Sequence, residues 1–351
     1  MGGIETNYSI HDIVTFKIVD QTGFFDRLLS NVYVQYKNFE TEEISNPDFI
    51  VYLGNFSPSN QDCYILDDRY YIKKDYFYCR DTRKLAKWEF EMNGFEGGRM
   101  TARIHTNLSG NLSISGNIID FLIDFKLNEK GFPLIHASCV SKNNKAFIFS
   151  ARSGGGKSTI ATYFLERGFN YLGDNYIILG KDWVLSFITP INIFTYNITP
   201  LIRNSLNRKD KILLLFKSYL HKLSGGYIKI FTKLDVSRLF PNKIIDKSKL
   251  DTIFLIIPRK EFRIEEINKE DLSEHLVINQ QLEFFHLPFL NYLSAYSYMF
   301  PDSKFSTRWE SYKENIESNL GNAILYKVEV PKKYDESVID MLFSMVGKGE
   351  D

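Results

Sequence analysis

Short apolar runs separated by clusters of turn-forming residues characterise the first third of the chain. Runs with alternating or aromatic-rich character predict β-strands over 13–19, 32–36, 49–53, 70–79, 88–92 and 100–105. The period then changes, because apolar residues at 118, 119, 122, 123 and 127 fall on one face of a helix. This helix is predicted over 117–130, with Gly131 as its C-cap. We therefore expect a β-rich N-terminal domain over residues 1–130.

The rest of the chain mixes the two periodicities. Apolar runs over 134–140 and 146–150 are joined through Asn143-Asn144, which predicts an antiparallel strand pair. The further predicted elements, in chain order, are a helix over 158–167, a strand over 169–173, a helix over 205–223, a central buried strand over 252–257, a strand near 323–330 and a last helix over 334–346. The pattern predicts an α/β (α+β) fold, with a second domain over residues 131–351.

Composition places the chain among ordinary globular proteins. Its 351 residues are 44% apolar and 25% charged, and 29 Phe, 21 Tyr and 3 Trp bring the aromatic share to 15%. Lys and Arg together number 43, as do Asp and Glu, so the formal net charge is zero. A zero balance argues against a whole surface that grips nucleic acid or anionic membrane. No apolar run approaches the roughly 18 residues of a membrane span, so we expect neither partner.

The N-terminus and the cysteines indicate a cellular compartment. The first residues lack a basic segment followed by an apolar one, so no secretory signal is expected. The three cysteines, Cys63, Cys79 and Cys139, cannot all pair with one another. Without secretion they are interpreted as reduced thiols, and the sequence predicts a cytoplasmic protein.

The neutral total conceals a strongly basic segment. Residues 201–250 hold 12 Lys and Arg against three Asp, a local balance of +9. One interpretation is a solvated basic face of a helix and its loops. The other is a surface that receives an acidic substrate or phosphate oxygens.

A glycine-rich loop carries the clearest chemical signal. Residues 151–158 read Ala-Arg-Ser-Gly-Gly-Gly-Lys-Ser, between an apolar strand and an amphipathic helix. Consecutive glycines let backbone N–H groups surround phosphate oxygens at a helix N-terminus. Lys157 would then reach the β- and γ-phosphates, and the Ser158 hydroxyl would ligate Mg²⁺. The predicted phosphate-binding residues are Ser153, Gly154, Gly155, Gly156, Lys157, Ser158 and Thr159. The alternative is a glycine turn followed by a chance Lys-Ser.

A carboxylate is expected close to this loop. Phosphoryl transfer requires an acidic group that holds metal or takes the proton of the acceptor. Asp174 stands at the end of the predicted strand 169–173, which we expect beside the loop strand. Ligands bind at the carboxyl ends of strands in α/β sheets, so Asp174 is the candidate; the alternative is an Asp that begins a turn.

Four segments belong together here: His136-Ala137-Ser138, Ser153-Gly154-Gly155-Gly156-Lys157-Ser158, Arg167-Gly168 and Gly173-Asp174-Asn175. In their order and spacing they resemble the catalytic core of the HPr kinase/phosphorylase family. The resemblance covers residues 135–180. It implies a P-loop kinase core with a mixed sheet, of the type shared with phosphoenolpyruvate carboxykinases, preceded here by the β-rich domain.

The resemblance also implies roles for particular residues. Lys157 and Ser158 match the phosphate and Mg²⁺ residues, and Asp174 matches the base that activates an acceptor serine. His136 matches the active-site histidine of the family, although by itself it reads as a core residue at a strand edge. The implied metal ligands are Ser158, Asp174 and Asn175, and the implied cofactors are ATP and Mg²⁺. The family forms hexamers, which makes a homo-oligomer compatible with the resemblance.

The chain also departs from the family pattern. Asn175 replaces the second Asp, Arg152 replaces an acidic loop residue, and Ala151 replaces the first glycine. The signature of the phosphorylase activity is not recognisable, so only kinase chemistry is expected. The chain looks closer to divergent HPr-kinase-related proteins, some of which phosphorylate a serine on a small precursor peptide.

The sequence therefore predicts an ATP- and Mg²⁺-dependent kinase acting on a serine hydroxyl of a protein or peptide. Asn175 and Arg152 motivate a second interpretation, a nucleotide-binding module that interacts with proteins without transferring phosphate. A small-molecule kinase, or a carboxykinase-like enzyme, is a third.

Overall fold

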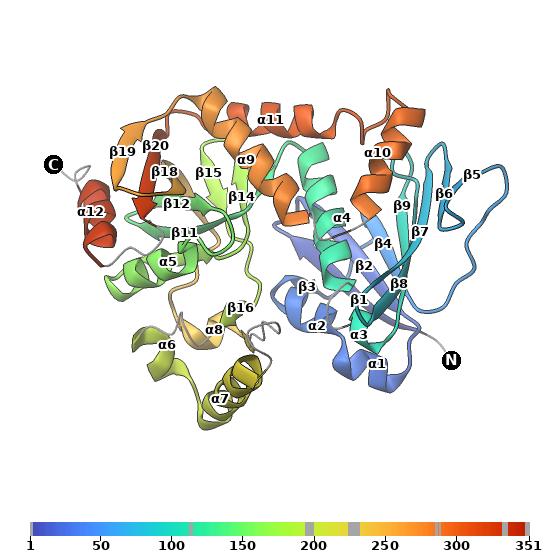
Figure 1. Ribbon diagram of the computed structural model, residues 1–351, viewed down its shortest axis with the longest axis horizontal. Coiled ribbons are helices and arrows are strands. Elements are labelled where there is room, and N and C mark those ends of the chain that lie inside the picture. Colours follow the sequence, from blue (N-terminus) through green and yellow to red (C-terminus); the bar gives the residue numbers. More distant parts are fainter. Residues whose placement is uncertain are drawn as a thin grey trace. The chain divides into compact units, whose positions relative to one another are not determined.

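The computed structural model describes residues 3–111, 115–193, 200–223, 232–284, 287, 289–331 and 336–347. Over these residues the chain is a mixed α/β protein with twelve α-helices and two large mixed sheets (Figure 1). It divides into two units, the first formed by Met1–Pro133 with Gln280–Asn315 and the second by Leu134–Asn279 with Ile316–Asp351. In the described part of the chain no helix combines the length and hydrophobicity that a membrane span requires.

The first unit is built on a nine-stranded sheet in the order β3-β1-β2-β4-β9-β8-β7-β6-β5. Its strands are β1 (Ile4–Ile10), β2 (Val14–Asp20), β3 (Glu40–Thr41), β4 (Phe49–Leu53), β5 (Tyr64–Leu66), β6 (Tyr70–Lys73), β7 (Tyr76–Arg83), β8 (Ala86–Asn93) and β9 (Met100–Thr106). Strand β4 pairs in parallel with β2 and with β9. Burial alternates residue by residue along β2 and β4, so one face of the sheet forms the core.

The helices of the first unit are short except for α4. They are α1 (Phe24–Leu29), α2 (Asn31–Tyr36), α3 (Leu108–Asn111), α4 (Ser115–Glu129) and α10 (Phe289–Met299), with a 3₁₀ turn over Lys37–Phe39. Helix α4 confirms the predicted helix, and Gly131 follows it at φ +82°. The division between the units falls within α9 (Lys269–Phe284) and within α11 (Arg308–Asn319).

Two predicted strands of the first unit differ in the structure. The strand predicted over 70–79 is the antiparallel pair β6 and β7, and the strand predicted over 32–36 is not a strand. Residues 32–36 are helix α2, because Ser30 caps it by accepting from the Val32 N–H at 3.3 Å. The Tyr36 hydroxyl also donates to Asp120 Oδ1 at 2.7 Å on helix α4. The helix thus has a local cap and a contact 84 positions away, and the local apolar pattern cannot show the second.

The residues that make up each unit differ from the domains expected from the sequence, which divided the chain between residues 130 and 131. The first break falls after Pro133, and residues Gln280–Asn315, which the sequence assigned to the second domain, group with the first unit. Aromatic packing explains this grouping. The Phe289 ring lies 5.0 Å from Phe90 and 5.3 Å from Phe121, so α10 covers the aromatic face of the sheet.

A buried charge pair further joins the two segments of the first unit. The Arg308 guanidinium forms a salt bridge with Asp124, and both side chains are almost fully buried. Gln280 Nε2 donates to the other oxygen of the same carboxylate at 2.9 Å. Burial raises the pKa of Asp124, and Arg308 and Gln280 oppose that rise. The carboxylate is thus stabilised by groups that arrive from the later part of the chain.

The second unit contains the other large sheet, in the order β10-β14-β15-β18-β12-β11-β13. Its strands are β10 (Leu134–Ile135), β11 (Ala137–Lys142), β12 (Lys145–Ala151), β13 (Asn170–Gly173), β14 (Ile177–Gly180), β15 (Trp183–Leu185), β18 (Lys247–Arg259), β19 (Arg263–Glu266) and β20 (Ile324–Pro331). Strand β18 pairs in parallel with β12 and with β20, which confirms the predicted central strand. Strands β16 (Ile191–Ile193) and β17 (Thr232–Leu234) form a separate small sheet.

Helix α5 (Lys157–Glu166) contacts β11 and β12, and α12 (Glu336–Gly347) contacts α5 (Figure 1). Their apolar side chains share one core with the strands: Phe164 of α5 lies 5.1 Å from Phe149 and 5.4 Å from Phe343. The loop between β12 and α5 is therefore supported by packed elements on both of its sides.

The helix predicted over 205–223 is confirmed as α7 (Arg208–Leu223). A break separates it from the short helix α6 (Pro200–Ser205), and α8 (Val236–Leu239) follows. Asn207 causes the break, because its Oδ1 accepts from the Asp210 N–H at 2.8 Å while Asp210 Oδ2 accepts from the Asn207 N–H at 3.3 Å. This reciprocal arrangement begins a new helix, as a capping box does. The three cysteines are free thiols, as predicted.

Candidate phosphate-binding site

The glycine loop connects the end of β12 to the start of α5. Gly154 and Gly156 have φ of +85° and +86°, values that side-chain-bearing residues rarely adopt. A Cβ on Gly155 would lie 2.8 Å from the Ala151 Cβ and 2.9 Å from the Arg152 carbonyl oxygen, so this position also requires glycine. Gly156 is the N-cap of α5 and has no side chain that could accept from the first-turn N–H groups.

Lys157 begins helix α5 and is buried. Its Nζ lies 2.7 Å from His136 Nε2 and donates to the Ala151 carbonyl oxygen at 2.7 Å. Its own carbonyl accepts from the Ser138 hydroxyl at 3.1 Å. The structure thus brings His136 and Lys157, which are 21 positions apart, into direct contact.

His136 is neutral in this environment. Burial lowers the pKa of its imidazole well below the usual range, and the positive charges of Lys157 and Arg152 lower it further. A hydrogen bond to the Asn175 backbone acts in the opposite direction. Because an ammonium only donates, Nε2 accepts from Lys157 and Nδ1 carries the ring proton. The Tyr176 ring lies edge-on to the imidazole, 5.7 Å away.

Ser158 and Asp174 form the second contact of the site. The Ser158 hydroxyl donates to Asp174 Oδ1 at 3.0 Å. Burial raises the pKa of Asp174, while the Ser158 hydrogen bond, the Lys157 charge and the Asn175 backbone lower it. The carboxyl therefore holds its proton to a higher pH than an ordinary Asp.

Strand β13 brings Asp174 to this edge by a different route from the predicted one. It was expected beside the loop strand, but β11 lies between β12 and β13. Since β11 is antiparallel to both, β12 and β13 run in the same direction and end at the same edge of the sheet. Asn175 follows at φ +88° with an exposed side chain, in a turn where Asn is well tolerated.

Asn279 of helix α9 is a site residue that the sequence analysis missed. Its Nδ2 lies within hydrogen-bonding distance of the His136 carbonyl oxygen (3.2 Å), Ser150 Oγ (3.3 Å) and the Ala151 carbonyl oxygen (3.4 Å). Its Oδ1 accepts from Arg152 at 3.5 Å. The side chain is buried, so it joins the two backbone segments that carry His136 and the glycine loop. The only signal in the sequence is the polar run Asn279-Gln280-Gln281 between apolar residues of the same helix.

Two further residues of the predicted phosphate-binding set, Ser153 and Thr159, lie in the loop and in the first turn of α5. Ser153 is exposed in the loop, and Thr159 is half-buried in the first turn of α5. A small recess adjoins Ser158 and Asp174, and its apolar wall includes Ile202 of α6 and Phe240. Its volume of about 10 Å³ has room for about one water molecule.

The oxygen donors at this edge fit a magnesium ion. A serine hydroxyl and a carboxylate 3.0 Å apart are hard oxygen ligands, which Mg²⁺ prefers. In the described residues no group of three His, Cys, Asp or Glu could hold a metal by itself. Mg²⁺ commonly completes its coordination shell with waters and substrate phosphates. Two protein ligands beside a glycine loop are therefore enough for a magnesium site.

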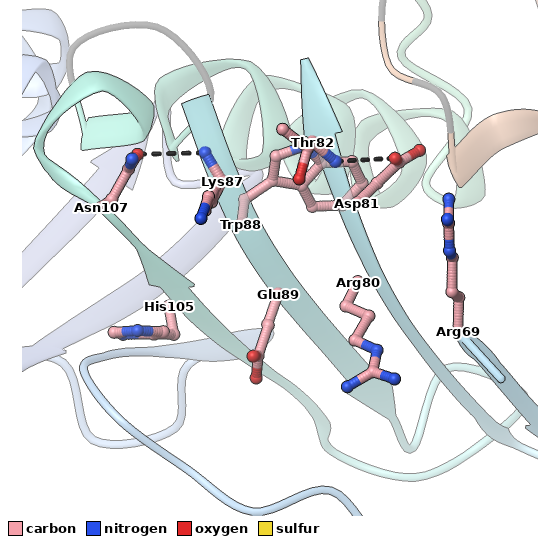
Figure 2. A pocket seen from close by; sticks show the side chains of 9 residues that line it. All are labelled: Arg69, Arg80, Asp81, Thr82, Lys87, Trp88, Glu89, His105 and Asn107. Carbon is pink, nitrogen blue, oxygen red and sulfur yellow. Dashed lines mark hydrogen bonds between the residues drawn. The ribbon is translucent and has the colours of Figure 1, made fainter. Parts of the chain in front are cut away.

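A second pocket, of about 490 Å³, lies on the sheet of the first unit (Figure 2). Arg80 of β7 stands opposite Glu89 of β8, and Glu89 stands opposite His105 of β9. Lys87 and Arg69 also line it. Positive and negative side chains are interspersed there, so this pocket does not by its charge define one class of ligand.

No protein-family profile matches the chain, and no curated protein sequence matches it. Among solved structures, the chain is similar to the Hpr(Ser) kinase/phosphatase from Coxiella burnetii, with 11% identity and a TM-score of 0.29. That match covers 62% of this chain and 95% of the other.

Proposed function

We propose that this protein is an ATP- and Mg²⁺-dependent kinase that transfers the γ-phosphate to a serine hydroxyl of a protein or small peptide. The observation that carries the proposal is the contact between Ser158 and Asp174, 3.0 Å apart beside a glycine loop at the N-terminus of a helix. It combines an anion-binding backbone with a metal ligand and a base at one edge of the sheet.

The loop and its lysine bind the nucleotide. The positive φ values of Gly154 and Gly156 turn the backbone toward the N-terminus of α5, where the helix dipole favours phosphate. Lys157 already lies at this point, held by His136 and the Ala151 carbonyl. Neutral His136 adds no positive charge of its own and orients the ammonium, so His136 is a positioning residue for Lys157.

Mg²⁺ bound with ATP would neutralise charge on the phosphates during transfer. Ser158 and Asp174 would hold it, with Asn175 as the third expected ligand. Asp174 also accepts the proton of the acceptor serine as that oxygen forms its bond to phosphorus and the β–γ bridging bond breaks. Burial moves the pKa of Asp174 upward, toward the range in which a carboxylate is an effective general base.

Two measurements on one variant test this function. Lys157→Ala should lose binding of Mg²⁺–ATP in calorimetry, and it should lower phosphate transfer from γ-labelled ATP by at least about a hundredfold. Arg259→Ala, an exposed residue of the same unit, is the matched control and should behave as the wild type. Undiminished nucleotide binding and transfer in Lys157→Ala would contradict the proposal.

A nucleotide-binding module without transfer is the second candidate. Arg152 is exposed and Asn175 provides a neutral amide where a second carboxylate was expected, and both features favour binding over turnover. The polar pocket of the first unit (Figure 2) would then serve protein recognition. Tight ATP binding with no turnover across a library of serine peptides would favour this candidate.

A further inference from the structure

Helix α7 carries an apolar stripe on its solvent side. Ile212, Phe216, Tyr219 and Leu223 follow one another at intervals of four, three and four, which places them on one face of the helix. Their side chains are 67%, 58%, 61% and 65% exposed, and neighbouring Leu215 is 70% exposed. Large apolar side chains that are exposed next to one another mark an interaction surface.

The opposite side of the helix is already packed. Leu214 is buried in the core of the second unit, and Asp210 forms a salt bridge with Arg238 of α8. The capping arrangement between Asn207 and Asp210 fixes where the helix begins. The exposed stripe therefore has a defined orientation, because the helix cannot turn it inward without losing these contacts.

The charges beside the stripe identify the kind of partner. Arg208, Lys209 and Lys211 are all exposed in the first turn of α7. The N-terminus of a helix favours acidic residues, so three cations there disfavour the helix by itself. Their positive charge adds to the positive end of the helix dipole. An acidic partner compensates for both.

The position of α7 connects this surface to the candidate site. Only Leu206 and Asn207 separate α7 from α6, and Ile202 of α6 lines the recess that adjoins Ser158 and Asp174. The stripe thus belongs to the same unit as the glycine loop.

We propose that the outward face of α7 is the docking surface for an acidic, amphipathic segment of the protein or peptide that is phosphorylated. Its apolar side chains pack on the Phe216 and Tyr219 region, and its carboxylates pair with Arg208, Lys209 and Lys211. This docking role rests on the proposed kinase function for the identity of the partner. The surface itself is tested without nucleotide, so the two proposals fail separately.

The test is a fluorescence-anisotropy titration with a labelled synthetic helix of about 18 residues, leucine on one face and glutamate on the other. The wild type and Lys157→Ala should bind it alike, and added salt should weaken binding. Phe216→Ser with Tyr219→Ser should weaken it by at least about tenfold. Met341→Ser, an exposed residue on another helix of the same unit, is the matched control and should bind as the wild type.

Several results would overturn the docking proposal. One is equal binding by the wild type and the double variant. Another is equal binding of a peptide with lysine in place of glutamate. A third is binding of anionic phospholipid vesicles, but not the peptide, through Phe216. A fourth is a dimer in sedimentation that the double variant dissociates, with no peptide binding. If Lys157→Ala instead retains ATP binding and phosphate transfer, the kinase function is contradicted. The result of the peptide titration is not affected by that outcome.

Discussion

The Ser158 hydroxyl donates to Asp174 Oδ1 at 3.0 Å, which joins the first turn of the loop helix to the end of β13. The two residues are 16 positions apart, and both were expected to coordinate the same Mg²⁺ ion. Their contact couples the affinity for metal to the protonation of the base, because one hydroxyl serves both.

The first prediction concerns the pH dependence of phosphate transfer. Asp174 acts as a base only when it is deprotonated, and burial already raises its pKa above the ordinary 3.8. Ser158→Ala removes a hydrogen bond that lowers this pKa, so the acidic limb of kcat/KM should move to higher pH. Arg259→Ala, an exposed residue outside the loop, should leave the limb in place. A limb that moves to lower pH in Ser158→Ala would contradict the assignment.

The second prediction concerns stability at the same carboxylate. Because the folded-state pKa of Asp174 is raised, the folded protein binds more protons than the unfolded chain between the two pKa values. The stability contributed by this group is present below the unfolded pKa and is lost as pH rises through the folded one. Asp174→Asn should therefore abolish transfer and yet raise the free energy of unfolding at neutral pH. Denaturant titrations at neutral and at acidic pH should show the gain shrink as pH falls.

The third prediction concerns Asn279. Its Nδ2 contacts two carbonyl oxygens and a hydroxyl that flank the site, so Asn279→Leu should leave buried acceptors without this donor. The expected loss in free energy of unfolding is about 1–3 kcal/mol. The affinity for ATP should fall as well, since the variant loosens the segment that holds His136. Ile278→Ser, the exposed neighbour on the same helix, is the control and should change neither quantity appreciably. An Asn279→Leu variant with wild-type ATP affinity would restrict the residue to a structural role.

The fourth prediction concerns the buried pair of the first unit. Arg308→Ala leaves Asp124 buried without its cation, and removal of one partner from such a pair costs about 3–5 kcal/mol. Lys17→Ala breaks an exposed pair with Glu5 and should cost less than about 1 kcal/mol. Chemical denaturation of both variants provides the comparison. Similar losses would mean that Asp124 finds another partner or takes up a proton at little cost.

Local sequence patterns correctly predicted the elements whose conformation is determined by residues next to one another in the chain. Strand β4 has the predicted ends, and the hairpin between β11 and β12 turns at Asn143 and Asn144, both at positive φ. Asn tolerates this conformation, so the dipeptide alone specifies the turn. The glycine loop is similar, because its conformation depends on residues that lie next to one another.

Features that depend on distant partners could not be predicted in this way. Tyr36 of helix α2 contacts Asp120 on another helix, whereas the apolar run of α2 taken alone is equally compatible with a strand. Asn279 contacts residues 127 to 143 positions earlier, so no spacing in the sequence connects it to the loop. The position of β13 depends on strand order, which a strand pattern does not contain. Sequence alone thus described the loop and named Asp174, but not what holds them together.

The discontinuous first unit has a consequence for synthesis on the ribosome. Its sheet emerges first, but Phe289, Phe305 and Arg308 follow only after the 134–279 segment. At about 5–20 residues per second, the aromatic face and Asp124 wait roughly ten to thirty seconds for these partners. A nascent chain or a fragment that stops near Pro133 therefore exposes the apolar, aromatic face of the sheet to solvent. Chaperone binding during translation, rather than activity, is where a slow or truncated product of this gene would first be noticed.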